Sequence, residues 1–122
     1  MPQIAANKVI HVGAILNNAS SFNANIVVDF VPDEVVIKGI SFNPAAPDPG
    51  ITYLYSNLVN DNIGSFFENF YIKPDLTFKL QTPVRGLYKF EIRDVANVHI
   101  PRTGDIIVRM DFVKYKEKGL IK

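Results

Sequence analysis

The sequence has 122 residues, of which 48% are hydrophobic and 20% charged; its formal net charge is +1, and it contains no cysteine. This length suits one domain, residues 1–122. The composition indicates that the chain folds, because disordered chains have fewer apolar residues and a larger net charge. The lack of cysteine excludes disulfides and thiolate chemistry, and the near-neutral charge argues against nucleic acid as a partner. No apolar run approaches the roughly 18–20 residues of a membrane span, so we expect no membrane partner and synthesis in the cytoplasm without a signal peptide.

Short runs rich in valine, isoleucine, phenylalanine and tyrosine follow one another along the chain and predict strands. In chain order these runs cover residues 8–16, 24–30, 34–42, 51–56, 62–67, 76–80, 86–94 and 105–116. The clearest is "GLYKFEIRD", in which Tyr88, Phe90 and Ile92 alternate with polar or charged residues. This period of two places the three apolar side chains on one face of a strand, toward a core.

Turn residues separate the predicted strands, because proline fixes φ and glycine, asparagine and aspartate tolerate turn geometry. Such residues gather in the segments 17–23, 31–34, 43–50, 73–75, 82–86 and 100–105. Around 57–61 the sequence fits either a single helical turn or a loop. Many short strands between frequent turns predict an all-β fold, a single antiparallel β-sandwich of about eight short strands that resembles a jelly roll.

Aromatic residues are abundant in the middle of the chain. Tyr53 and Tyr55 share one face of a predicted strand, and "FFENFY" brings Phe67, Phe70 and Tyr71 close together in sequence. Two interpretations stay open for these rings: they fill the core and anchor loops, or they form an interface between protein molecules.

Asn60, Asp61 and Asn62 form a polar cluster before a predicted strand. Turn chemistry explains this cluster best, because asparagine and aspartate favour turns. It does not match the helix–loop–helix calcium template, although a less regular calcium site built on Asp61 stays open. Beside Tyr53 and Tyr55, the same amide and carboxylate groups would suit a sugar, so a glycan is a possible ligand and a lectin-like carbohydrate-binding module is the alternative function.

No catalytic, cofactor or metal site is predicted. His11 and His99 are the only histidines and lie far apart in sequence, whereas a zinc site needs three or four converging ligands. No serine lies in a nucleophile-elbow motif, and no glycine-rich loop matches a phosphate-binding motif. We therefore expect a protein that is not an enzyme.

The segment 30–66 contains "FVPDEVVIKGISF", a proline-rich loop and "YLYSNLVNDNIGSF". Its hydrophobic spacing resembles that of small β-sandwich proteins, jelly-roll-type virion structural proteins of large DNA viruses, virophages and polinton-like elements. The resemblance implies a non-enzymatic structural protein of the virion, a minor capsid, spike or cement component. It also implies a homo-oligomer, trimeric or pentameric, with other capsid proteins as partners.

Overall fold

The computed structural model describes residues 3–44, 52–66, 71–72, 75–94, 96, 98 and 101–116. The described residues form nine strands and no helix. In chain order the strands are β1 (Ile4–Ala19), β2 (Ser21–Val27), β3 (Glu34–Pro44), β4 (Thr52–Ser56), β5 (Asp61–Phe66), β6 (Tyr71–Ile72), β7 (Leu76–Lys79), β8 (Arg85–Arg93) and β9 (Arg102–Tyr115). Each of the eight predicted runs overlaps one of these strands, and the two-residue β6 is the additional one.

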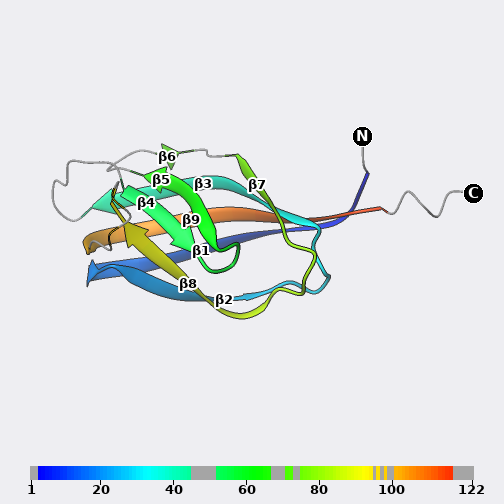
Figure 1. The fold of residues 1–122 in the computed structure, drawn as a ribbon, viewed down its shortest axis with the longest axis horizontal. Helices are drawn as coiled ribbons and strands as arrows, with labels where there is room; N and C mark the ends of the chain where they lie inside the picture. The colour runs from blue at the N-terminus through cyan, green and yellow to red at the C-terminus, as the bar shows by residue number, and fades with distance from the viewer. Residues whose placement is uncertain are drawn as a thin grey trace, which may run out of the picture.

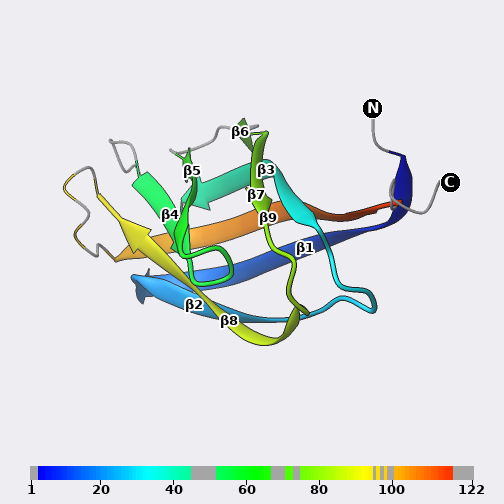
Figure 2. The same cartoon turned by 45° about the vertical axis from the view of Figure 1, so that its right-hand side comes forward.

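The strands form two antiparallel sheets that pack face to face (Figures 1 and 2). One sheet has the order β1-β9-β3-β6, with β7 also paired to β3, and the other has the order β2-β8-β4-β5. β1 and β9 run side by side along most of the molecule (Figure 1), from the pair Ile4 and Tyr115 to the pair Ala19 and Arg102. The predicted all-β sandwich is confirmed.

The core lies between the two sheets and follows the alternation of the strands. On β8, Phe90 and Ile92 are fully buried and Tyr88 is half-buried, whereas Leu87 on the opposite face is 67% exposed. Phe90 stacks on Phe22 of β2, with ring centroids 5.0 Å apart and an interplanar angle of 7°. The predicted inward face of this strand is therefore correct.

Two predicted turn segments are largely strand. Within 17–23 only Ser20 separates β1 from β2, because β1 extends to Ala19 and β2 begins at Ser21. The register of β1 shifts between Leu16 and Ala19, and Asn18 there has a φ of 52°, so the asparagine preference appears as a bulge within the strand. Within 100–105, β9 already begins at Arg102, whose guanidinium donates hydrogen bonds of 2.8 and 3.2 Å to the hydroxyl of Thr52. In both segments, pairing with strands distant in sequence extends the strands beyond the boundaries that the turn residues predicted.

The end of β9 is fastened to the start of β3 by the side chains of Asp33 and Glu34. The backbone N–H of Tyr115 donates to the Asp33 carboxylate at 2.8 Å, and the Tyr115 hydroxyl donates to Glu34. The hydrogen bond to Glu34, followed by desolvation and the nearby carboxylates, raises the pKa of Tyr115 above its ordinary value of 10.0.

Candidate functional site

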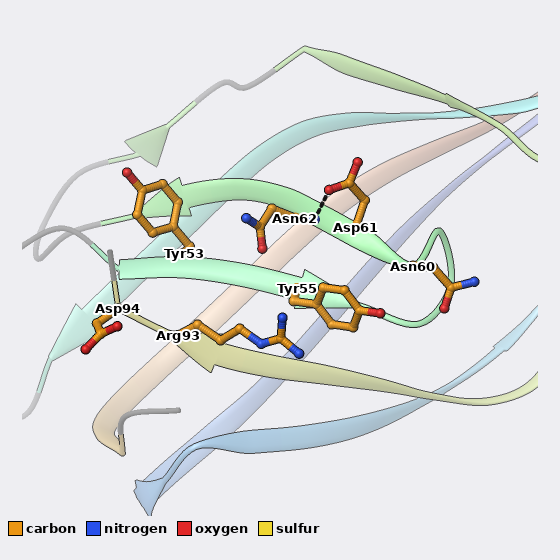
Figure 3. A pocket seen from close by; sticks show the side chains of 7 residues that line it. All are labelled: Tyr53, Tyr55, Asn60, Asp61, Asn62, Arg93 and Asp94. Atoms are coloured by element: carbon orange, nitrogen blue, oxygen red, sulfur yellow. Dashed lines mark hydrogen bonds between the residues drawn. The ribbon is translucent and has the colours of Figure 1, made fainter. Parts of the chain in front are cut away.

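A depression of about 380 Å³ lies on the outer face of the four-stranded sheet, where β4, β5 and β8 run side by side (Figure 3). We call it the tyrosine depression. It is lined by Tyr53, Tyr55, Asn60, Asp61, Asn62, Arg93 and Asp94.

β4 places the two tyrosines. Thr52, Leu54 and Ser56 point into the core and are buried, so Tyr53 and Tyr55 between them point outward and are half-buried. This arrangement follows directly from the two-residue alternation of a strand.

β5 brings an amide beside the tyrosines. In the register of β4 and β5, Leu54 pairs with Gly64 and Tyr55 pairs with Asn62, so Ile63 is an extra residue in β5. This β-bulge buries Ile63 completely and keeps Asn62 exposed beside Tyr55.

β8 supplies a positively charged group that is already paired. Arg93 lies opposite Tyr53 in the register, and its guanidinium carbon lies 4.0 Å from the centroid of the Tyr55 ring. Its terminal nitrogen is 3.1 Å from a carboxylate oxygen of Glu91, and the two side chains are only 17% and 15% exposed. The arginine is therefore held in place by a ring and a carboxylate.

The loop between β4 and β5 is a turn at residues 57–60, with no helix. The Asn57 side-chain oxygen accepts a hydrogen bond of 2.9 Å from the backbone N–H of Lys89, which ties the turn to β8. Asn60 has a φ of 55°, a left-handed conformation that asparagine tolerates well, and one Asp61 carboxylate oxygen accepts from the Asn62 N–H at 2.7 Å. Turn formation thus accounts for part of this polar cluster.

Five of the predicted interface or binding residues line the same depression, namely Tyr53, Tyr55, Asn60, Asp61 and Asn62. Phe67 and Phe70 lie outside the described residues, as does most of the proline-rich segment 43–50, and the side chain of Tyr71 in β6 is likewise not described. Sequence reasoning missed Arg93 and Asp94. The alternation in "GLYKFEIRD" places Arg93 on the outward face of its strand, which was the available signal for this residue. No signal in the sequence indicated that β8 would pair with β4.

A second surface feature lies on the outer face of the five-stranded sheet. Gly13 of β1 pairs with Ile107 of β9, and a Cβ atom added at Gly13 would lie only 2.8 Å from the backbone oxygen of Ile106. The strands therefore approach each other closely here. A shallow hollow of about 430 Å³ surrounds this point, with Ile15, which is 86% exposed, and Ile107, which is 49% exposed, along its lining.

The remaining candidate groups do not gather into a site. His11 is exposed on β1, opposite Arg109, and His99 lies outside the described residues. Among the residues that the structure describes, no three histidine, aspartate or glutamate side chains are grouped to hold a metal ion. The described part of the chain also has no helix long and apolar enough to cross a membrane.

No family model and no curated protein matches the sequence. Among solved structures, the chain is similar to the Drosophila NLP-core, with 15% identity and a TM-score of 0.51 over 87% of this chain and 98% of that one. It also matches a protein of Bacillus endospore appendages, a family of disulfide-linked pili, with 9% identity and a TM-score of 0.35 over 93% and 90% of the two chains. The likeness to the Drosophila structure agrees with the β-sandwich fold.

Proposed function

We propose that this chain is a non-enzymatic structural protein that assembles from copies of itself. The observation that carries the proposal is the pair of exposed aliphatic side chains next to Gly13, namely Ile107, its partner on β9, and Ile15, two residues along β1. We call these three residues the assembly patch. Clustered apolar surface of this kind is typical of association sites, and the shallow hollow that these residues line offers space for a side chain of a neighbouring copy.

The position of β1 supports the same function. β1 is 16 residues long and lies at one end of its sheet, paired with β9 on one side. Its other edge has no strand partner among the described residues. A long edge strand presents unpaired N–H and C=O groups, which a second copy can satisfy by pairing.

The fold is compatible with closed assemblies. The Drosophila NLP-core, which this sandwich resembles, is described in terms of pentamer formation and histone binding. The number of strands in each sheet also supports the predicted jelly roll, which has eight strands in two sheets. If β6 and β7 count as one interrupted strand, because both pair with β3, each of the two sheets contains four strands. Trimers and pentamers are the assemblies that we propose for this chain.

A virion role is the more specific part of the proposal, and it is supported by the resemblance of segment 30–66 to virion structural proteins. In that setting the chain would be a minor capsid, spike or cement component in contact with other capsid proteins. Mass spectrometry of purified virus particles tests this role. Peptides of the chain in stoichiometric amounts support it, and their absence from particles of a virus that encodes the chain contradicts it.

Self-association is tested by sedimentation velocity at micromolar concentration. We expect an oligomer for the wild type and at least roughly a tenfold weaker association for Ile15→Asp, because an unpaired carboxylate in an apolar contact is costly. Leu87→Asp is the matched control, since Leu87 is 67% exposed on the opposite sheet. A wild-type monomer, or equal effects of the two substitutions, would refute assembly through this patch.

A further inference from the structure

We propose that the tyrosine depression binds a neutral saccharide by direct contact, without a metal ion. Its volume of about 380 Å³ falls in the range of small-ligand sites, roughly 300–1,000 Å³. It lies on the four-stranded sheet, opposite the assembly patch on the five-stranded sheet, so saccharide binding does not require self-association.

The tyrosine rings fit the shape of a sugar. A pyranose ring has apolar C–H faces and a rim of hydroxyl groups, and a tyrosine likewise combines an apolar ring with a polar hydroxyl. Tyr53 and Tyr55 project from the same side of β4 with Asn62 between them on the neighbouring strand (Figure 3). A sugar ring on Tyr53 would therefore have its hydroxyl groups near the amide of Asn62.

The polar groups offer both donors and acceptors, which a polyol needs. Asn60 and Asn62 carry amides that donate and accept, whereas the carboxylates of Asp61 and Asp94 accept. Both carboxylates are fixed by backbone groups: Asp61 accepts from Asn62 N–H at 2.7 Å, and Asp94 accepts from the N–H groups of Ala96 and Val98 at 2.9 and 3.0 Å. No described residue donates a hydrogen bond to the second oxygen of either carboxylate, so that oxygen can accept from a ligand hydroxyl, and its position needs little further ordering.

The charges disfavour an acidic ligand, and one of the two rings already has a cation. Arg93 lies over Tyr55, so a cationic ligand would find only Tyr53 and the carboxylates of Asp61 and Asp94 as partners. A cation could also make no use of the amide donors. An acidic sugar is disfavoured because Asp61 and Asp94 would repel it while the charge of Arg93 is balanced by Glu91.

Nuclear magnetic resonance titration of the ¹⁵N-labelled full chain tests the proposal in buffer containing EDTA. The probes are the methyl glycosides of glucose, galactose, mannose and N-acetylglucosamine, with sialic acid and lysine amide as charged comparisons. We expect a neutral glycoside to shift the amide signals of residues 53–62 and 93–94 with a dissociation constant on the order of millimolar, as befits one sugar on an open site.

Variants locate the contact. Tyr53→Ala and Asn62→Ala should each weaken binding at least roughly fivefold, whereas Tyr53→Phe should retain most of it because the ring stays. Lys89→Ala is the control on the same sheet outside the lining, and it should bind like the wild type. The dispersion of the NMR spectrum shows that each variant is folded.

Three results would overturn the proposal. The first is that no glycoside shifts these signals at tens of millimolar. The second is that lysine amide or sialic acid shifts them more strongly than every neutral glycoside. The third is glycoside binding that Tyr53→Ala and Asn62→Ala leave unchanged.

Discussion

Phe90→Ala should be among the most destabilising substitutions in this protein. The Phe90 side chain is 0% exposed and stacks on Phe22, so its loss removes buried apolar area, a ring pair and the packing around both. Phenylalanine-to-alanine changes in cores cost about 3–5 kcal/mol, a large share of a total stability of about 5–15 kcal/mol. For a chain of 122 residues this corresponds to a fall in Tm of roughly 10–20 °C.

Urea denaturation followed by circular dichroism, at one fixed protein concentration, measures the effect. Leu87→Ala is the matched control, because Leu87 lies on the same strand but is 67% exposed, and it should change stability by less than about 0.5 kcal/mol. A double-mutant cycle with Phe22→Ala should give a coupling of about 0.5–1.5 kcal/mol for the ring pair. Similar losses for Phe90→Ala and Leu87→Ala would refute the assignment of the inward face of β8.

Three further substitutions test single contacts. Gly13→Ala should destabilise the fold by about 1–3 kcal/mol in thermal melts, because its methyl group would press on the backbone of β9, and an unchanged Tm would refute that close approach. Asn57→Ala should cost about 0.5–1.5 kcal/mol in urea unfolding, since it removes the acceptor of the Lys89 N–H, and a neutral effect would mean that water replaces it. Tyr115→Phe should remove the contribution of the hydrogen bond to Glu34 to the unfolding free energy. This contribution is fully present below about pH 10, the pKa of tyrosine in the unfolded chain, and it is lost as the pH rises through the higher pKa of Tyr115 in the folded protein. The difference in unfolding free energy between wild type and Tyr115→Phe should therefore shrink above pH 10, and a constant difference would contradict the hydrogen bond to Glu34.

The strands were predictable where one face of a strand is buried. In β8 the alternation of apolar and polar residues is regular, and the structure buries the predicted face. In β9 burial also alternates from Gly104 to Phe112. The predicted strand boundaries were less accurate. Asn18 has the left-handed φ of 52° that its residue type favours, but it lies within β1, where its backbone N–H donates to the Thr103 hydroxyl at 2.9 Å across the β1–β9 pair. No local signal indicates a partner so distant in the chain.

The candidate site was predictable to the extent that it is local. Tyr53 and Tyr55 share a face by alternation, and Asn62 joins them through the short connection between β4 and β5. Arg93 is the last residue of β8 and Asp94 follows it, and the pairing of β8 with β4 spans a long stretch of chain. Hydrophobic periodicity assigns a residue to a face of its strand, but it does not say which strand lies beside it.

The position of β9 has a consequence for synthesis. β9 lies between β1 and β3, although it is the last of the described strands in the chain. While the chain is being synthesised, β1 and β3 are therefore made before β9, the strand that pairs with both of them. The sheet forms late, because contacts of high sequence separation form slowly. The β9 of a chain being translated nearby has the same sequence and fits the same gap. Exchange of this strand between nascent chains would give intertwined molecules, and their yield should rise when many ribosomes read one message.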